Sequence, residues 1–599
     1  MTDLPVTRTP RQATAAEVYF YRRVVDALLR EDLRECVSRA QVREDAPLPA
    51  SLAGLHPPVQ CWLHCAHLGL WMPVLPARYM QRWRAGDGPL LAEGPAGLMA
   101  LHSLDEVVAC FSKGLDTDAA RPFHDFGQEC ALALAHWEAC EGEQRRWFAS
   151  LPVPDNAAAE WPERLLHHDR LAAFLDHPFY PTARAKLGFA AADLSRYSPE
   201  FAPRFQLNWL AVPQARYHPS CNRELPGWPA FSDVGLPPAL ADTHALLPVH
   251  PFVWANQLTG MLAATGFAHD TVRAPLPWMT VTPTLSVRTL VLCDAPEWHI
   301  KLPLTIRTLG ARNIRTIKPS TIGDGHRIQS LLAAVVAQEP DLAGRVLLTD
   351  EEVGAHVDHQ TFLGFIARRY PAQDLLDGTP VPIAGLLADD PAGGSVLEKL
   401  VERHYQGDLS RFFDEYLTLT LRLHLTLWLR YGIALESNQQ NSVLVFSGRG
   451  LRLLLKDNDA ARIHRDALGR RWPELATQIA GLQDERIAVD TELPLAQMFI
   501  TITLQLNLAA PVTAMAERLG QPATPWYRRI AQAIDSVLCS LAAAGEDTGM
   551  ARRMLLEDET LPIKYLLSAA TLLDKRETGA RDVNKFYGQT SPNFLKAAR

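Results

Sequence analysis

Positively charged and hydroxyl side chains are concentrated in one stretch of the sequence, residues 284–325. Its apolar runs resemble two strands joined by a short connection, which predicts a hairpin. Arginine can hold two phosphate oxygens at once, and Ser and Thr hydroxyls can complete such a cradle. The stretch predicts a site for a phosphate-bearing ligand, although a strand pair with a solvated basic face fits the same pattern. The residues concerned are Ser286, Arg288, Thr289, Lys301, Arg307, Arg312, Arg315 and Lys318.

Oxygen-bearing side chains gather in a second stretch, where a long apolar run gives way to a strand-like hairpin. Carboxylate and amide oxygens, together with phosphate and water, are the ligands that Mg²⁺ prefers. The stretch predicts a magnesium pocket, and a polar hairpin with turn-forming Asn and Asp is the alternative. The side chains are those of Glu436, Asn438, Gln440 and Asn441, with Asp457 and Asp459 ending the returning strand.

The two stretches complement each other chemically. One supplies cations and hydroxyls for phosphates, and the other supplies carboxylates for a metal and amides for a polar substrate. The sequence contains no GxxxxGK[ST] loop, no GxGxxG after a strand and no GxSxG motif. The pairing therefore points to a nucleotide-using transferase or ligase with a less familiar phosphate cradle.

Hydrophobic periodicity predicts the elements that position these stretches. A helix opens the fold, strands rich in Val, Leu, Thr and Trp begin near residue 200, and a helix starts after His250-Pro251. A buried helix should end at Gly432, a natural C-terminal stop, ahead of two strands joined by a Gly-Arg-Gly turn. The expected helices cover residues 14–43, 104–148, 163–176, 395–431 and most of 470–575, with loops at 151–162 and 577–595.

Four potential zinc ligands lie close together in CWLHCAHLGLW. No second pair lies at the distance that usually completes a tetrahedral site. The apolar surroundings favour a buried amphipathic helix instead of a metal centre. The side chains are those of Cys61, His64, Cys65 and His67.

Composition is that of an ordinary globular protein, with 47% hydrophobic and 21% charged residues among 599. That length exceeds a single core, so two or three domains are expected. A formal net charge of −8 argues against a nucleic-acid or membrane-surface binder, and no long apolar run or signal-peptide pattern is evident. The nine scattered cysteines favour reduced thiols and a cytoplasmic location.

Five segments, in order along the chain, together resemble the IucA/IucC family of siderophore synthetases, which work without a peptide-synthetase assembly line. The resemblance covers roughly residues 160–470. The matching segments are DHPFYPTARAKLG from Asp176, LPVHPFVW from Leu247, SVRT from Ser286, KLPLTI from Lys301 and ESNQQN from Glu436.

The resemblance implies an α+β, multidomain, cupped-hand fold with thumb, fingers and a distantly kinase-like palm. The expected boundaries are 1–160 for the thumb-like domain, 161–395 for the fingers-like domain and 396–599 for the mostly helical palm-like domain. It also implies an ATP- and Mg²⁺-dependent ligase, often a homodimer. Such an enzyme adenylates a carboxylate of a di- or tricarboxylic acid, releases pyrophosphate, and joins the acyl group to an amine or alcohol with loss of AMP.

The resemblance also implies a role for each matching position. Ser286, Arg288 and Thr289 would hold the ATP phosphates. Lys301 would bridge the α-phosphate and the substrate carboxylate, with Arg315 sharing that role and Arg312 as the alternative. Gln440 would face the substrate or the α-phosphate. The Mg²⁺ ligands would be Glu436, Asn441, Asp457 and Asp459.

Three positions depart from the family pattern. Asn438 stands where the family often has a histidine that is expected to contact a citrate carboxylate. Asparagine donates hydrogen bonds but carries no charge, so the preferred acid is predicted to be α-ketoglutarate or an already amidated citrate. Tyr180 replaces the second histidine of the early motif and Asp176 replaces a glycine, which changes the early loop's contacts.

Two other functions fit parts of the pattern. Lys301 and the KDND segment loosely resemble a kinase lysine and metal-binding aspartate, so a phosphotransferase acting on a small carboxylate-bearing metabolite is one alternative. Against it, the sequence has no HRD-type catalytic loop. A non-catalytic carboxylate-binding protein is the other. The released nucleotide separates the enzymes, because a ligase of this kind yields AMP and a kinase yields ADP.

Overall fold

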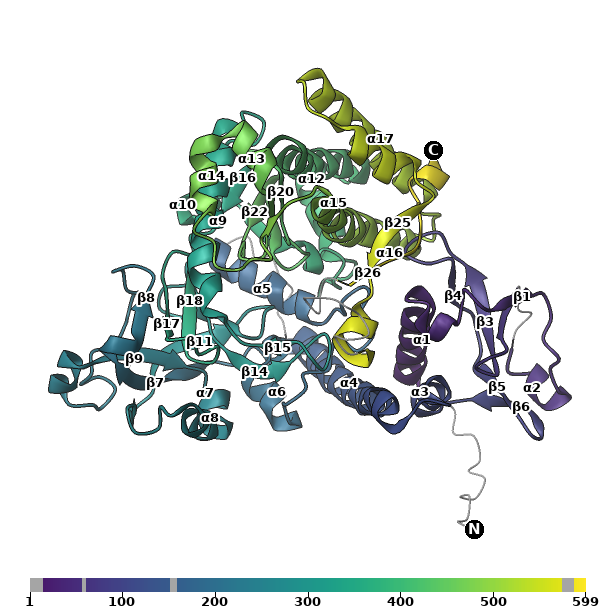
Figure 1. Cartoon of the computed structure of the whole chain (residues 1–599), viewed down its shortest axis with the longest axis horizontal. Helices are drawn as coiled ribbons and strands as arrows, with labels where there is room; N and C mark the ends of the chain where they lie inside the picture. Colours follow the sequence, from purple (N-terminus) through teal and green to yellow (C-terminus); the bar gives the residue numbers. More distant parts are fainter. Residues whose placement is uncertain (1–13, 57–60, 151–158, 574–585) are drawn as a thin grey trace, which may run out of the picture.

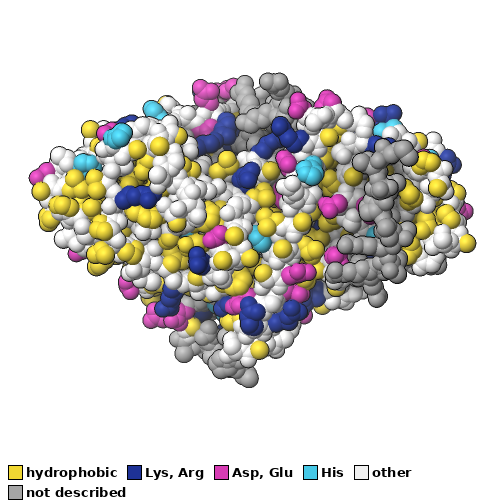
Figure 2. Space-filling view, turned by 90° about the horizontal axis from the view of Figure 1, so that it is seen from below, with side chains coloured by type: hydrophobic (Ala, Val, Ile, Leu, Met, Phe, Trp, Pro, Cys, Tyr) yellow, Lys and Arg dark blue, Asp and Glu magenta, His cyan; other side chains and the backbone are white. Residues whose placement is uncertain are grey.

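The computed structural model describes residues 14–56, 61–150, 159–573 and 586–599 of the chain. Helices and mostly antiparallel strands form separate groups along it, which is an α+β arrangement as predicted. Figure 1 shows an N-terminal sheet at one end, a larger sheet at the other, and a helical group joining them. Figure 2 shows basic and acidic side chains interspersed over the lower face.

The N-terminal region combines the α-helices α1 to α4 with a six-stranded sheet. Helix α1 (Ala15–Arg30) begins at a capping box in which Thr14 and Glu17 bond each other's backbone N–H groups. The helix predicted over 14–43 was too long, because the chain turns after Arg30 and re-emerges as a strand. The other elements are β1 (Gln41–Arg43), α2 (Ala50–Ala53), β2 (Trp62–Cys65), β3 (Leu70–Pro76), β4 (Trp83–Ala85), β5 (Leu90–Gly94), β6 (Gly97–Leu101), α3 (Leu104–Ser112) and α4 (Thr117–Ser150).

The segment from Cys61 to His67 is a strand and turn, so the predicted buried helix was wrong. Gly69, with φ +62°, closes the turn between β2 and β3. Cys65 is buried, whereas His64 stacks on Trp71 and bonds Glu93. In the described part of the chain, no group of three or more His, Cys, Asp and Glu side chains could hold a metal ion.

The middle region is built on a nine-stranded sheet in the order β10-β7-β11-β12-β13-β18-β17-β8, with β9 beside β7. The strand-rich character predicted from residue 200 is confirmed, and α7 (Pro251–Asn256) begins after His250, whose ring caps it. The strands are β7 (Phe205–Pro213), β8 (Tyr217–Pro219), β9 (His244–Val249), β10 (Val272–Arg273), β11 (Trp278–Pro283), β12 (Thr289–Leu292), β13 (Trp298–Lys301), β17 (Gly354–Val357) and β18 (Gly364–Arg369).

A small β-ribbon and several helices connect this sheet to its neighbours. β14 (Leu304–Arg307) and β15 (Ile314–Arg315) pair in the centre of the molecule (Figure 1). Helix α9 (Pro319–Gln338) follows and packs into the C-terminal core. The remaining helices of this region are α5 (Trp161–Ala173), α6 (Ala191–Tyr197), α8 (Leu258–Thr265) and α10 (Ala372–Leu375).

The C-terminal region surrounds the long helix α12 (Leu409–Tyr431). It ends at Gly432 with φ +66°, where glycine avoids the strain of a left-handed backbone. The predicted hairpin is β21 (Ser442–Phe446) with β22 (Arg452–Leu455). A four-stranded sheet adds β16 (Val346–Leu348) and β19 (Thr379–Pro382). Because these two strands precede residue 396, elements from both sides of that position share one core, and the three domain boundaries stay a prediction.

A continuous helical run, Leu493–Arg518, is long and apolar enough to cross a membrane by length and composition alone. Its most apolar window is 89% buried inside the protein, as in a core helix. It comprises α15 (Leu493–Met498), a π-helical stretch (Phe499–Ala509) and α16 (Ala510–Arg518). The other elements are α11 (Val396–Tyr405), β20 (Ile433–Ala434), β23 (Arg462–His464), α13 (Arg465–Arg471), α14 (Pro473–Ile479), β24 (Ala488–Val489), α17 (Thr524–Ala543) and α18 (Gly549–Arg552).

The chain end returns to the N-terminal region through β25 (Thr560–Lys564) and β26 (Tyr587–Pro592), which pair antiparallel. The tail predicted as loop-like therefore contains a strand, and its residues 577–585 lie outside the described residues. Between the two strands, a π-helical turn at Ser568–Leu572 packs with α1, β2 and α4 in one hydrophobic cluster. The predicted loop at 151–162 also lies largely outside the described residues.

Candidate active site

Two neighbouring cavities lie in the centre of the molecule and share Arg288 and Arg315 in their walls. The first is about 320 Å³ and includes Ser286, Asn438, Gln440, Asn441 and Asp457. The second is about 260 Å³ and includes Lys301, Glu436 and Asp459. The fold therefore brings ten of the twelve sequence-predicted site residues around one pair of arginines.

Arg288 is held by a tight turn between β11 and β12. The Thr289 N–H donates to the Ser286 carbonyl at 2.7 Å, and the Thr289 hydroxyl donates to Ser286 Oγ at 3.4 Å. Thr289 is buried and lines neither cavity, so it braces the turn. The Arg288 guanidinium donates to the Thr316 carbonyl at 2.7 Å, which crosslinks this turn to the segment after β15.

Arg315 lies on β15, and its Nε donates to the Thr308 hydroxyl. Arg312, the alternative, lines neither of the two cavities. Its backbone N–H donates to the Ala570 carbonyl at 3.1 Å instead. The geometry thus favours Arg315 over Arg312 as the residue that can contact a ligand here.

The two shared guanidinium groups are not neutralised locally. Within the described residues, neither Arg288 nor Arg315 forms an ion pair with a carboxylate. Burial, together with repulsion from Arg288, lowers the pKa of Arg315 to about 9. Burial also lowers the pKa of Arg288, against the attraction of Asp457 and Asp459. Because arginine stays protonated in proteins, these shifts express a cost of holding two cations that a bound anion would offset.

Lys301, by contrast, forms ion pairs with two carboxylates. Its Nζ forms a close ion pair with Asp457 and lies 3.5 Å from Asp459 Oδ2. Arg368 contacts the same Asp457 oxygen at 3.3 Å and pairs with Glu351 at 2.5 Å. This buried network joins the end of β13, β18 and the end of β22.

The two aspartates differ in charge environment. Although burial alone would raise the pKa of Asp457, Lys301 and Arg368 hold it well below its ordinary value. Burial raises the pKa of Asp459 above its ordinary value, and repulsion from Asp457 adds to this despite Lys301. Asp457 also adopts φ +62°, and its N–H donates to Glu351 at 2.8 Å. Such a backbone costs about 1–3 kcal/mol, which the surrounding network must offset.

Asn438 closes a polar turn ahead of β21. Its Oδ1 accepts the N–H groups of Gln440 at 3.0 Å and Asn441 at 3.2 Å. With its oxygen committed to the turn, Asn438 has only Nδ2, a neutral donor, left for the first cavity. The sequence-based interpretation of this residue as an uncharged donor fits that geometry.

The expected magnesium ligands divide between the cavities. Asn441 and Asp457 line the first, and Glu436 and Asp459 line the second, where Glu436 pairs with Lys564 at 3.3 Å. Mg²⁺ commonly uses one or two carboxylates and completes its shell with phosphate and water. Asp457 and Asp459 satisfy that minimum as hard oxygen donors, with Lys301 occupying the space between them.

The early motif contributes two buried ion pairs and a histidine to the first cavity. Arg184 pairs with Asp176 at 3.1 Å, and Lys186 pairs with Glu200 at 2.7 Å. His177 Nδ1 accepts the N–H groups of residues 179 and 180 at 3.2 and 3.1 Å, which leaves the proton of the neutral ring on Nε2. Burial, with nearby arginines, lowers the pKa of His177 to about 3, so the ring stays neutral.

Tyr180 points away from the cavities and is fully buried. Its hydroxyl donates to Glu129 at 2.7 Å and lies 2.8 Å from the Thr571 hydroxyl. The second aromatic position of the early motif is therefore part of a structural network. Sequence reasoning did not find Glu351, Arg368 or Lys564. Glu351 lies in an acidic connection, Arg368 is one of two adjacent arginines in β18, and Lys564 ends β25, so no recognisable motif surrounds any of them.

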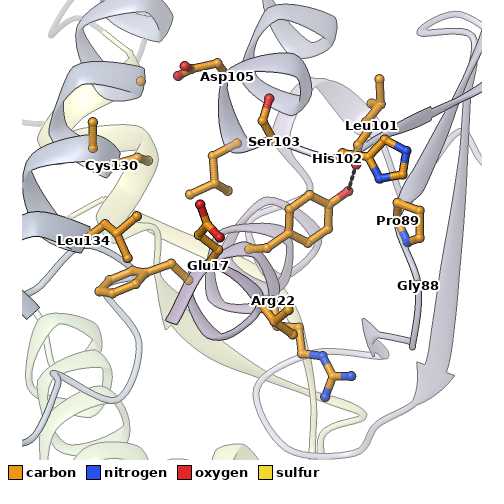
Figure 3. Close-up of a pocket in the computed structure, with 16 residues that line it drawn as sticks. Glu17, Arg22, Gly88, Pro89, Leu101, His102, Ser103, Asp105, Cys130 and Leu134 are labelled. Atoms are coloured by element: carbon orange, nitrogen blue, oxygen red, sulfur yellow. Dashed lines mark hydrogen bonds between the residues drawn. The ribbon is translucent and has the colours of Figure 1, made fainter. Parts of the chain in front are cut away.

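A further cavity of about 370 Å³ lies in the N-terminal region between α1, β6, α3 and α4. Figure 3 shows Glu17 and Leu134 pointing into it, with Cys130 beside them. Its lining is mainly apolar and contains none of the residues predicted to do chemistry. The arginine-centred pair of cavities is therefore the better candidate for a reaction site.

Comparison with known proteins adds to what the fold and the two cavities show. Residues 168–388 match the IucA / IucC family, and residues 410–580 match the ferric iron reductase FhuF-like transporter family. The family that the motifs predicted is thus matched over residues 168–388.

Two relatives and two solved structures illustrate the similarity. The chain is 24% identical to staphyloferrin B synthase of Staphylococcus aureus, over 69% of this chain and 73% of that one. It is 30% identical to the uncharacterized protein y4xN of Sinorhizobium fredii over 51% of this chain, a match that spans about half (53%) of that protein. The fold resembles that of petrobactin biosynthesis protein AsbB from Bacillus anthracis, with a TM-score of 0.71 and 17% identity over 98% of this chain and 96% of that one. It also resembles that of ATP-bound aerobactin synthetase IucA from Klebsiella pneumoniae, with a TM-score of 0.67 and 19% identity over 97% of this chain and 99% of that one.

Proposed function

We propose that the protein is an ATP-dependent siderophore synthetase that adenylates a carboxylate of a di- or tricarboxylic acid and condenses it with an amine or alcohol. The observation that carries this proposal is the Arg288–Arg315 pair, which lacks a carboxylate partner among the described residues and is shared by two cavities. One cavity can hold the acid and the other the nucleotide, so that their reacting groups meet at the arginines. The name of the ATP-bound IucA structure supports ATP as the nucleotide.

The reaction requires two substitutions. A carboxylate oxygen of the acid attacks the α-phosphorus of ATP, a P–O bond forms, and pyrophosphate leaves. The nitrogen or oxygen of the second substrate then attacks the acyl carbon, AMP leaves with the bonding pair, and the nucleophile's proton is released. No covalent bond to the protein is needed in either step.

The residues have separate roles in this scheme. Arg288 and Arg315 stabilise the charge that develops on the five-coordinate α-phosphorus, an effect that fixed donors in a buried site supply strongly. Ser286 contributes a hydroxyl, Thr289 braces the turn, and Gln440 orients the acid or the phosphate. Lys301 can turn from Asp457 to the incoming phosphate.

Magnesium would be held by Asp457 and Asp459, with Asn441 and Glu436 as further oxygen donors. When bound, it would neutralise phosphate charge and help pyrophosphate to leave. Its carboxylate ligands are those that Lys301 now engages, so phosphate binding and metal binding would both draw on the same ion-pair network.

The acid is proposed to be α-ketoglutarate in preference to free citrate. Asn438 offers a neutral N–H donor because its oxygen is held by the turn. A neutral donor suits a keto or amide oxygen, whereas a further carboxylate would gain more from a charged partner. An amidated citrate fits the same donor. The expected homodimer and cytoplasmic location remain predictions.

The test is turnover with ATP, Mg²⁺ and hydroxylamine in the presence of α-ketoglutarate, citrate or a citryl amide. We expect acid-dependent release of pyrophosphate and AMP, with α-ketoglutarate ahead of citrate. Release of ADP would instead support a kinase-like phosphotransferase. Acid binding in a calorimeter without any ATP binding would support a carboxylate-binding protein. Absence of turnover with every acid would refute the synthetase proposal.

A further inference from the structure

The π-helical turn Ser568–Leu572 contacts the loop that leads to Arg315, although the two lie far apart in sequence. The Ala311 N–H donates to the Thr571 hydroxyl oxygen at 3.3 Å. The Arg312 N–H donates to the Ala570 carbonyl at 3.1 Å. Shortly before Arg315, the backbone of the loop is thus hydrogen-bonded to the C-terminal turn.

Gly310 makes the closest approach in this contact. Its φ is +120°, and a Cβ added there would lie 2.3 Å from Ala570 Cβ and 2.8 Å from the Ala570 carbonyl oxygen. Both the backbone conformation and the space admit only glycine. The loop therefore packs directly against the backbone of the C-terminal turn.

The C-terminal turn is itself anchored in the N-terminal region. The Glu31 carboxylate accepts the N–H groups of Leu567 at 2.8 Å and Ser568 at 2.7 Å, at the start of the turn. The Thr571 hydroxyl lies 2.8 Å from the Tyr180 hydroxyl, which in turn bonds Glu129. Leu567, Ala570 and Leu572 are buried in the N-terminal hydrophobic cluster. Figure 1 shows this C-terminal segment, in yellow, between α1 and β15.

The loop that packs on the C-terminal turn determines where the Arg315 guanidinium lies. Thr308 precedes the loop and accepts the Arg315 Nε hydrogen bond, and Leu309, with φ +55°, lines the first cavity with Arg315. A shift of the loop on Ala570 would move both the backbone of Arg315 and the hydroxyl that orients its side chain. A misplacement of about 1 Å in a catalytic group can cost on the order of 100-fold in rate.

We propose that the C-terminal turn is a clamp that sets Arg315 for its reaction, with Gly310 and Thr571 as positioning residues. This inference rests on the proposed synthetase function. In it, the N-terminal region, the early motif and the C-terminal region of the chain act together on one arginine, although none of the clamp's own residues lines either cavity.

The first test compares Gly310→Ala with Gly97→Ala. Gly97 has a similar φ of +109°, but nothing lies within 4 Å of an added Cβ. The two variants share the backbone strain and differ only in the contact with Ala570. We expect Gly310→Ala to lower kcat on the order of 100-fold with a smaller change in KM for the acid, and Gly97→Ala to keep the wild-type kcat. Equal kcat values in the two variants would overturn the clamp.

The second test removes a single hydrogen-bonding group. Thr571→Val deletes the acceptor of the Ala311 N–H, and Thr571→Ser restores it. Thr590→Val is the matched control, because Thr590 bonds Tyr565 and Arg30 in the same C-terminal segment without touching the loop. We expect only Thr571→Val to accelerate amide hydrogen exchange at Ala311 and Arg312 and to weaken binding of inorganic tripolyphosphate in a calorimeter.

These readouts separate the clamp from the proposed function. If the wild type turns over no acid, the synthetase proposal fails. Amide exchange and tripolyphosphate binding still test whether the C-terminal turn positions the loop that leads to Arg315. If the wild type is active and Thr571→Val behaves as Thr590→Val does in exchange, binding and kcat, the clamp is wrong and the synthetase proposal stands.

Discussion

Two groups of cations lie at the centre of this protein and differ in how they are neutralised: Lys301 and Arg368 are buried, whereas Arg288 and Arg315 are half-buried in the cavity walls. Lys301 and Arg368 are joined to Asp457 and Glu351 by short ion pairs. Arg288 and Arg315 have no carboxylate ion-pair partner among the described residues, and repulsion from Arg288 adds to the cost of charging Arg315. Charges withdrawn from bulk water are normally paired, so two cations that face the cavities without an ion-pair partner mark where a ligand's charge belongs.

The difference also indicates what each group does. A paired cation supports the fold and can be released to a ligand only if its partner finds another cation, such as Mg²⁺. An unpaired cation is ready for an anion without rearrangement, which is the condition for strong electrostatic stabilisation of a transition state. Substitutions in the first group should therefore act on stability as well as activity, and those in the second group on activity alone.

The largest effect is expected from Lys301→Met. Removing one partner of a buried ion pair costs about 3–5 kcal/mol, because the remaining charge stays buried. Here Asp457 and Asp459 would lose their shared cation, so both the free energy of unfolding and turnover should fall. Chemical denaturation measures the first, and pyrophosphate release the second.

The double variant Lys301→Met/Asp457→Asn is the control for that change. Removing one of the two carboxylates that Lys301 neutralised should recover some of the lost stability without recovering activity, because Arg368 keeps its ion pair with Glu351. A Lys301→Met protein as stable as the wild type would show that the ion-pair network does not support the fold, and the contrast with the arginine pair would disappear.

Arg315→Gln should lower activity without a loss of stability. Removing one fixed donor to a developing charge costs about 100- to 1000-fold in kcat, while relief of repulsion from Arg288 should leave the melting temperature unchanged or raised. Arg312→Gln is the matched control, since Arg312 lies on the same loop outside both cavities. Equal losses of activity in the two variants would contradict the assignment of Arg315.

A smaller effect is expected from Asn438→His, which changes the neutral donor of the first cavity. At His177, a ring nitrogen accepts two backbone N–H groups, so a histidine at 438 can keep its turn in the same way. Its other nitrogen can carry a proton and favour a carboxylate. We expect the ratio of kcat/KM for citrate over α-ketoglutarate to rise roughly tenfold, the equivalent of about 1.4 kcal/mol. An unchanged ratio would show that Asn438 does not select the acid.

Sequence reasoning brought together residues most of which line the candidate site, because they lie in short motifs with strong local signals. The hairpin after Gly432 follows from turn chemistry and strand alternation, which depend on neighbouring residues. Glu351, Arg368 and the Gly310–Ala570 contact depend on which strands and turns meet in three dimensions, and no local pattern carries that information. The helix predicted at Cys61 was wrong because the spacing of the cysteine, histidine and leucine residues fits the period of a helix as well as the period of a strand.

The smallest effect concerns buried carboxylates, where the same contrast between paired and unpaired charge applies. Glu129 has no cation bonded to it among the described residues and accepts only from Tyr180 and Thr182. Burial raises its pKa despite those bonds and the more distant Arg307. Above pH 4.5, the ordinary value, the unfolded chain releases this proton while the folded chain retains it, so stability is lost as pH rises.

Glu129→Gln should therefore flatten the fall of the melting temperature from pH 4.5 upward, with a change of about 1 kcal/mol in the free energy of unfolding. Glu351→Gln provides the opposite case, because it removes the closer of the two carboxylate partners of buried Arg368 and should destabilise the protein by more. Thermal melts of both variants across pH measure the contrast. If Glu129→Gln and Glu351→Gln shift the melting temperature alike, local pairing does not decide how buried charge acts in this protein.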